Sequence, residues 1–197
     1  MHDQVAIYFG SVPGDLETFS ILSQVVQAEA KKFFIERTRI KKWRRTGIIW
    51  WNMIDGWPQI SDAVVDYYYA KKLAYHYIKR VQRPVCLMMD ELVDWTHDVV
   101  LGNDSRETHE VTWSVENGET GEILMSGKTV SPANENVVLG AIREFAGDQK
   151  LYVLRYEIDG VQYANHYISG YPHFDADRML RWIEIIRKLP GSFELTR

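Results

Sequence analysis

The stretch from 47 to 66, GIIWWNMIDGWPQISDAVVD, constrains the fold more than any other part of the chain. Residues 47–51 form an uninterrupted apolar run of β-branched and aromatic side chains, which is typical of a strand buried on both faces. Such strands occur in the sheets of α/β folds. The run leads directly into Asn52, Asp55 and Trp57, so polar and aromatic side chains follow at the predicted end of a buried strand.

These side chains have the chemistry needed to hold a sugar. A pyranose presents an apolar C–H face that stacks on an aromatic ring, and a rim of hydroxyl groups that need donors and acceptors. Trp51 and Trp57 provide rings, and Asn52 and Asp55 provide polar groups. Tryptophans more often belong to a core than to a ligand platform. However, α/β barrels build their sites from the loops at the carboxyl ends of the strands, so we predict that these four residues bind carbohydrate.

Residues 51–80 contain several fixed spacings. The pattern W-x-x-x-D-x-W-P is followed by S, then V-D-Y-Y, then K-x-A-Y-x-x-x-K-R. Together these motifs resemble the end of the catalytic barrel in glycoside hydrolase family 2, in its β-mannosidase-like branch. Similar segments of that family form the eighth barrel strand, its loop and the last barrel helix. The rest of the chain is similar, through looser motifs, to the closing β-sandwich of the family.

The resemblance implies a retaining exo-β-glycosidase that hydrolyses O-glycosyl bonds with two glutamates, one an acid/base and one a nucleophile. In the family these glutamates come from the fourth and seventh barrel strands, and the matching region begins after the seventh. Glu17, Glu29 and Glu36 lie on a predicted helix, and we expect them to face outward. We therefore assign no catalytic residue to this chain and expect it to be inactive alone.

The resemblance also implies roles for single residues. Trp51 matches the tryptophan that forms a floor of the sugar subsite, and Asp55 and Trp57 match the motif in the following loop. Asn52 stands where relatives vary. Asp55 either binds a sugar hydroxyl or holds the loop backbone, and Asp66 is expected to anchor the loop. By analogy, a β-mannoside is favoured over a β-glucuronide, β-galactoside or glucosaminide.

The N-terminal part of the chain is predicted to be mainly helical, with one barrel-type strand. We expect a short strand or extended segment over 5–9, an amphipathic helix from 16 to about 45 that Asp15 caps, and a helix over about 70–81. A residue before proline is disfavoured in helical geometry, so Pro84 marks our domain boundary. Residues 1–83 are predicted to be the C-terminal part of a (β/α)8 barrel.

Residues 84–197 are predicted to form an immunoglobulin-like antiparallel β-sandwich with a C-terminal helix over 175–189. The fold class is therefore α+β. Trp113 alternates with polar neighbours, so we interpret it as a core residue, with a carbohydrate platform as the less favoured alternative. The predicted strands cover 85–89, 95–101, 110–115, 122–130, 135–143, 150–158 and 161–169.

Composition and the remaining motifs argue against other functions. A formal net charge of −4 disfavours a nucleic-acid partner, and we interpret the basic cluster over 41–45 as a solvated helix end. His166, His173 and Asp175 fit no compact metal motif, so we predict no metal and no cofactor. Cys86 is expected to be a core residue. We identify no signal peptide and no apolar stretch of membrane-spanning length, so we expect a cytoplasmic protein without a membrane partner.

Three hypotheses for function remain. The first is the C-terminal portion of a β-mannosidase-like hydrolase, whose partner is the missing N-terminal portion or a second copy. The second is a carbohydrate-binding or structural β-sandwich module without chemistry. The third is a split enzyme, in which another chain supplies the other barrel strands. An isolated barrel strand would expose both edges and an aromatic surface, so we expect a dimer or a rearranged N-terminal segment.

Overall fold

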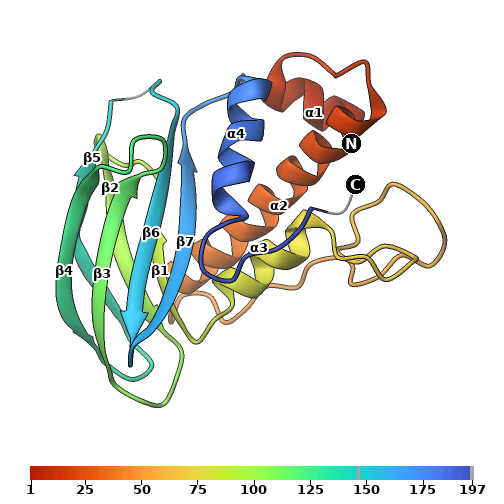
Figure 1. Cartoon of the computed structure of the whole chain (residues 1–197). Coiled ribbons are helices and arrows are strands. Elements are labelled where there is room, and N and C mark those ends of the chain that lie inside the picture. Colours follow the sequence, from red (N-terminus) through yellow and green to blue (C-terminus); the bar gives the residue numbers. More distant parts are fainter. Residues whose placement is uncertain (146, 196–197) are drawn as a thin grey trace.

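The computed structural model describes residues 1–145 and 147–195 (Figure 1). Helices come first, then strands, then one more helix, as the predicted α+β class requires. The elements are α1 (His2–Phe9), α2 (Leu16–Ile40), α3 (Leu73–Val81), β1 (Val85–Met89), β2 (Thr96–Asn103), β3 (His109–Asn117), β4 (Ile123–Ser131), β5 (Asn136–Arg143), β6 (Lys150–Ile158), β7 (Val161–Ser169) and α4 (Ala176–Ile186).

The strands form two antiparallel sheets that pack face to face. One sheet has the order β1-β2-β5 and the other has the order β4-β3-β6-β7. Successive side chains of a strand point to opposite faces of the sheet, which explains which residues of β3 reach the core. Val111, Trp113 and Val115 are buried, while Thr112 is exposed. These residues pack against apolar side chains of the smaller sheet, including Leu87. The predicted antiparallel sandwich is confirmed.

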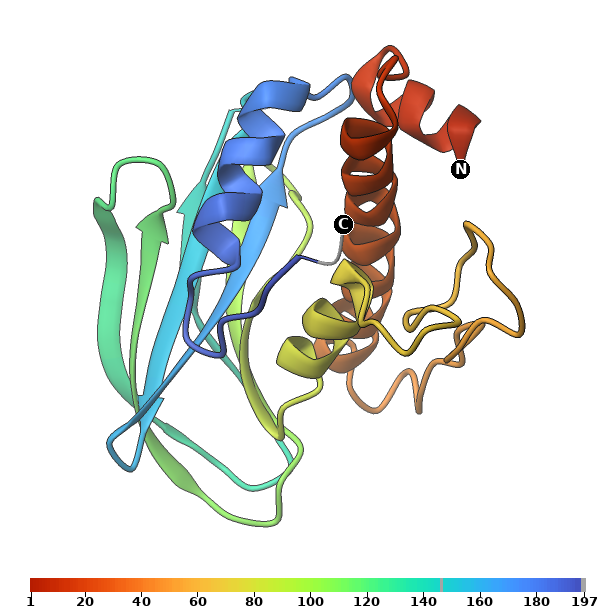
Figure 2. The ribbon, with the colours of Figure 1, turned by 45° about the vertical axis from the view of Figure 1, so that its right-hand side comes forward.

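The helices lie against the larger sheet. Figures 1 and 2 show α4 alongside β7, and α2 and α3 also contact β7, α2 through Glu36 and Asn165. Met179 and Trp182 of α4 are buried in the same cluster as Leu151 of β6. Asp15 accepts a hydrogen bond from the Thr18 backbone N–H at 2.8 Å, so the predicted N-cap of α2 is confirmed.

The expected strand or extended segment over 5–9 is wrong, because these residues belong to α1. Val5 and Phe9 are spaced four residues apart and are both buried, so a helix places them on one face. Gly10 ends the helix with a φ of 80°. Tyr8 stacks on Phe174 with ring centroids 4.7 Å apart, which joins α1 to the segment before α4.

The predicted barrel-type strand over 47–51 is also wrong. None of these residues belongs to a strand, and Ile49 is 100% exposed. A strand buried on both faces needs neighbours that hydrogen-bond to it, and the described residues of this chain place no strand beside it. Residues 46–72 instead form a long loop that projects away from the sandwich (Figure 2).

The predicted change from helix to strand at Pro84 is found, with α3 ending at Val81 and β1 beginning at Val85. The division into a barrel part and a sandwich domain stays a prediction. Among the described residues, no helix is both long enough and apolar enough to cross a membrane.

We predict that Trp182→Ala lowers the free energy of unfolding by about 3–5 kcal/mol, because large-to-small changes in a core lose burial and leave a cavity. Trp182 is 1% exposed and joins α4 to the helical cluster. Urea unfolding followed by circular dichroism measures the change. The exposed neighbour Arg181, changed to Ala, is the matched control and should shift the free energy by less than about 0.5 kcal/mol. Equal shifts for the two variants would contradict the proposed role of α4.

Candidate functional site

The predicted binding residues lie on one loop, but they differ in exposure. Trp51 is 74% exposed and Trp57 is 65% exposed, so both rings are accessible. Asn52 is half-buried, and its side-chain oxygen is buried without a hydrogen-bond partner. Asp55 is buried. The loop therefore presents two tryptophans outward and holds one carboxylate inward.

The Asp55 carboxylate is the buried anchor of the loop. It accepts hydrogen bonds from Lys72 Nζ at 2.9 Å, from Gln59 Nε2 at 3.3 Å and from the Ser61 hydroxyl. Burial acts to raise the pKa of Asp55, but the hydrogen bonds from Lys72 and Ser61 outweigh it and hold the pKa below its usual value. Asp55 is thus a charged group paired within the protein.

Backbone hydrogen bonds close the loop around this anchor. The Asp55 N–H donates to Val65 O at 3.1 Å, and the Val64 N–H donates to Asn52 O at 3.2 Å. The Asp66 carboxylate accepts from two backbone N–H groups, those of Tyr68 and Ala70, both at 2.8 Å. The expected anchoring role of Asp66 is confirmed, and the loop has a defined shape.

Two side chains of helix α2 hold the loop backbone. Lys31 Nζ donates to the backbone oxygen of Trp51 at 2.9 Å and lies 5.0 Å from the ring centre of Trp50. Gln27 Nε2 donates to the backbone oxygen of Asp62 at 2.5 Å. These contacts join residues that are far apart in the sequence and belong to no motif, so they were not predicted. Lys72 lies in the K-x-A-Y motif, which was the one signal that could have pointed to it.

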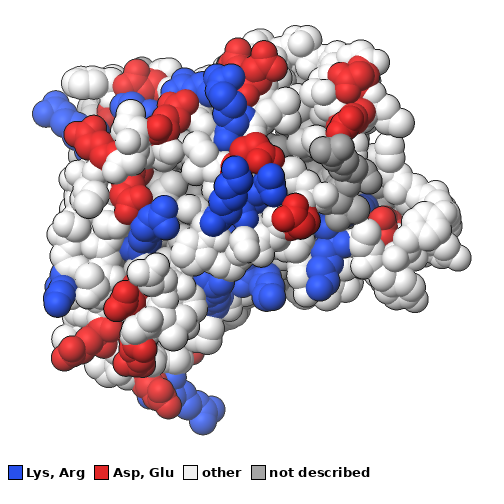
Figure 3. Space-filling model, in the orientation of Figure 1, with Lys and Arg blue, Asp and Glu red and all other residues white. Residues whose placement is uncertain are grey.

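An apolar surface surrounds the two tryptophans. On the face shown in Figure 3, the side of the molecule that carries this loop has few charged side chains. Contiguous exposed apolar surface of this kind marks interaction sites. We call these residues the loop surface: Ile49, Trp51, Met53, Trp57, Ile60, Tyr67, Tyr68 and Tyr69, all of which are exposed.

The expectation that all three helix glutamates face outward is wrong for Glu29 and Glu36. Glu17 is exposed, but Glu36 is buried and accepts hydrogen bonds from Lys32 Nζ and Asn165 Nδ2, both at 2.6 Å. Glu29 Oε1 lies 2.8 Å from His166 Nε2. The reason is that α2 turns these side chains toward the sandwich, where ion pairs and hydrogen bonds compensate their burial. Neither carboxylate belongs to the loop surface.

The other candidate groups have structural partners. Asp175 caps α4 by accepting from the Arg178 N–H at 2.6 Å, and His166 lies beside Glu29 of α2. Among the described residues, no group of three possible metal ligands lies together. Cys86 is buried, and burial raises its pKa to about 11, so it stays a thiol.

Helix α2 ends at Ile40 and not near residue 45 as predicted, and the two lysines that follow it form ion pairs. Lys41 Nζ lies 3.0 Å from Asp90 Oδ2, and Lys42 Nζ lies 2.7 Å from Asp104 Oδ1. These acidic partners neutralise charge that phosphate binding would need. Their pairing favours our interpretation of the cluster as a helix end.

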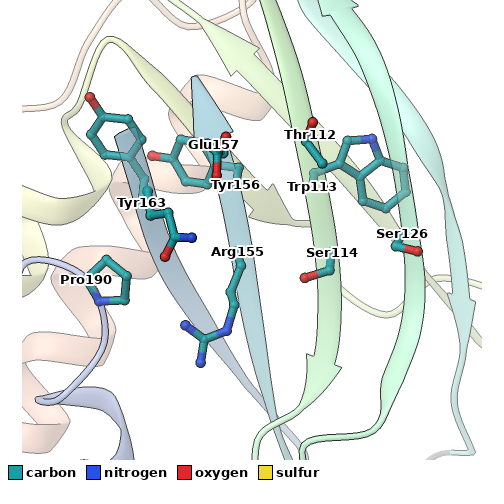
Figure 4. A pocket seen from close by; sticks show the side chains of 10 residues that line it. Thr112, Trp113, Ser114, Ser126, Arg155, Tyr156, Glu157, Tyr163 and Pro190 are labelled. Carbon is teal, nitrogen blue, oxygen red and sulfur yellow. The ribbon is translucent and has the colours of Figure 1, made fainter. Parts of the chain in front are cut away.

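Trp113 lies in the core, as predicted. It is 7% exposed and packs against Gly127, where an added Cβ would lie 3.1 Å from the indole. A pocket of about 280 Å³ lies beside it. Figure 4 shows Arg155 from β6, Tyr163 from β7 and Pro190 among the residues that line it. Arg83 and Tyr156 contact the Tyr163 ring, so this cavity lacks the open aromatic platforms of the loop surface.

The chain is similar to known proteins in part of its sequence and in its fold. No protein-family model matches the chain. Over 91 residues, or 42% of the chain, it is 40% identical to Beta-mannosidase B of Aspergillus niger and 37% identical to Beta-mannosidase B of Aspergillus flavus. The matched region covers 10% of each fungal protein, so the chain spans only a small part of the curated relatives that it matches.

Two solved structures share the fold. A β-D-mannosidase from Dictyoglomus thermophilum has a TM-score of 0.71 at 24% identity, with 87% of this chain and 22% of that chain covered. An exo-chitosanase from Amycolatopsis orientalis has a TM-score of 0.64 at 19% identity, with 84% and 21% covered. The chain is a relative of the C-terminal part of glycoside hydrolase family 2 enzymes. The predicted family resemblance is therefore confirmed.

For this family 2 relative, the buried pair of His166 and Glu29 predicts a dependence of stability on pH. Burial lowers the pKa of His166 to about 4 from an ordinary value of 6.5, so the unfolded chain binds the proton more readily. Stability is then fully present above pH 6.5 and is lost as the pH falls toward 4. The loss should reach about 3 kcal/mol at pH 4.

Urea unfolding at several pH values measures this loss, and His166→Gln should reduce its slope between pH 6.5 and 4. His76, which stacks on Phe193, should leave a residual slope because burial also lowers its pKa to about 4. The exposed His2, changed to Gln, is the control and should leave the slope unchanged. A His166→Gln slope equal to that of the unsubstituted chain would contradict the assignment.

Proposed function

We propose that the chain forms the C-terminal part of a retaining exo-β-glycosidase of the β-mannosidase type, which hydrolyses O-glycosyl bonds. The observation that carries the proposal is the pair of exposed tryptophans, Trp51 and Trp57, on a loop held by a buried Asp55. The identity of 40% to a fungal Beta-mannosidase B supports a β-mannoside as substrate.

In this proposal, Trp51 is the floor of a sugar subsite. Its exposed ring can stack on the C–H face of a pyranose. Asn52 follows it in the chain, but its side-chain oxygen is buried, so we do not assign that oxygen to a sugar hydroxyl. Asp55 already accepts bonds from Lys72, Ser61 and Gln59, so of its two predicted roles we propose the loop-holding one. Trp57 provides a second ring on the same loop.

The chain contributes no catalytic carboxylates in this proposal. Retaining glycosidases need two carboxyl groups that flank the scissile bond. Glu29 and Glu36 are committed to His166 and Lys32 beneath α2. The remaining portion of the hydrolase would supply the acid/base and the nucleophile, and it would cover part of the loop surface.

Hydrolysis and binding test this proposal together. We expect the purified chain to hydrolyse no aryl β-glycoside in a panel of mannoside, glucuronide, galactoside and glucosaminide. We also expect it to bind methyl β-D-mannopyranoside weakly. Trp51→Ala should lower that affinity about tenfold, if a sugar face gains from one aromatic ring what a stacked base gains, about 1–3 kcal/mol. Amide and indole chemical shifts in an NMR titration report the binding.

Trp95→Ala is the control, because Trp95 is 53% exposed but lies at the start of the sandwich strands. It should leave the affinity unchanged. Turnover that Trp51→Ala abolishes would contradict the absence of catalytic carboxylates. Tight binding by the chain without any second portion would favour the non-catalytic carbohydrate-binding module instead.

The loop surface generates a further prediction about assembly. Exposed apolar patches drive association, so sedimentation velocity should show self-association that grows with protein concentration. Ile49→Asp should reduce this association, because a charge would be buried in the contact. Val138→Asp, at an exposed position on β5, is the matched control and should leave it unchanged. A single monomeric species at all concentrations for the unsubstituted chain would contradict the prediction.

A further inference from the structure

Lys72 connects the start of a helix to the middle of the loop. It occupies the N-cap position of α3, and its backbone N–H donates to Val64 O at 3.0 Å. Its side chain reaches Asp55 Oδ2 at 2.9 Å and Ser61 O at 3.3 Å, and is only 12% exposed. The backbone of Lys72 is therefore fixed at the start of α3, while its ammonium group is bound within the loop.

Within the loop tip, which we define as residues 51–62, the Lys72 ammonium group contacts the Asp55 carboxylate and the Ser61 backbone oxygen. Among residues 51–60, all of which the structure describes, Asp55 alone is buried, and its side chain is 0% exposed. Trp51 precedes it by four positions and Trp57 follows it by two. A shift of Asp55 would therefore move both rings, since each is joined to it by a short length of backbone.

Helix α2 cannot replace this contact. Its bonds from Lys31 to Trp51 O and from Gln27 to Asp62 O reach the two ends of the tip. Residues 56–60 between these ends are all exposed. The orientation of Trp57 therefore depends on the buried carboxylate between the two supported ends.

The structure assigns Lys72 as the positioning residue of the carbohydrate surface: its ion pair with Asp55 sets the relative orientation of Trp51 and Trp57. This inference rests on the proposed function. Lys72 does not touch the sugar in this assignment and acts through its contacts with Asp55 and Ser61 O. The second observation behind it is the bond from Lys72 Nζ to Ser61 O at 3.3 Å, which fixes the direction of the ammonium group.

The test compares four variants in titrations with methyl β-D-mannopyranoside, followed through the indole signals of Trp51 and Trp57. Lys72→Met should weaken binding at least about tenfold, because small displacements of binding groups are costly. Lys72→Arg keeps the charge and should restore affinity to within about threefold. Lys79→Met, at an exposed position of the same helix, is the control and should leave the affinity unchanged.

The double variant Asp55→Asn with Lys72→Met separates positioning from stability. It leaves no unpaired buried charge, so its thermal unfolding should return toward that of the unsubstituted chain. Its affinity should stay low, since the ion pair is still missing. Recovery of affinity in the double variant, or full affinity in Lys72→Met, would overturn the assignment.

Amide hydrogen exchange distinguishes a failure of the proposed function from a failure of the positioning role of Lys72. Lys72→Met should speed exchange at the N–H groups of Asp55, Val64 and Val65, which close the loop, and leave exchange in β6 unchanged. Absence of sugar binding by the unsubstituted chain would overturn the proposed function. Unchanged exchange at these amides would overturn the positioning role of Lys72 whether or not the sugar binds.

Discussion

The buried carboxylate of Glu36 joins the N-terminal helices to the sandwich. It accepts from Lys32 Nζ and from Asn165 Nδ2, both at 2.6 Å, and Asn165 also donates to Leu87 O at 2.9 Å. Moving an ion pair out of water is costly unless its hydrogen bonds are complete. We therefore interpret this cluster as a device that selects one docked position for α2, because sliding the helix by one turn would leave charges buried without partners.

The loop surface depends on that docked position. Lys31 and Gln27, which hold the loop from below, lie on the same helix as Lys32 and Glu36. Helix α3 supplies Lys72 and packs closely against α2. Binding groups are placed more accurately when they are supported by rigid elements than by loops alone. The positions of the tryptophans therefore depend on α2 and α3, which the sandwich holds in place.

Sequence patterns predicted the sandwich well, because alternation along a strand is a local signal. β1, β6 and β7 have the predicted bounds 85–89, 150–158 and 161–169. The run over 47–51 has the composition of a buried strand but lacks the neighbours that would make it one. Glu29 and Glu36 were misplaced because a charged residue on a helix predicts exposure unless its partner is known. His166 and Asn165, those partners, are more than 100 residues away.

Contacts between residues far apart in the sequence also limited how much of the candidate site could be predicted. Spacing identified Trp51, Asp55 and Trp57, but not that Asp55 points inward while both rings point outward. That division has a physical consequence for a surface that must receive a sugar. If apolar packing held the rings, their faces would be covered and unable to stack on a ligand. Polar anchors beneath the loop fix the backbone and leave the ring faces free. Lys31, Lys72 and Gln27, which hold the loop, therefore matter as much to a carbohydrate surface as the aromatic rings themselves.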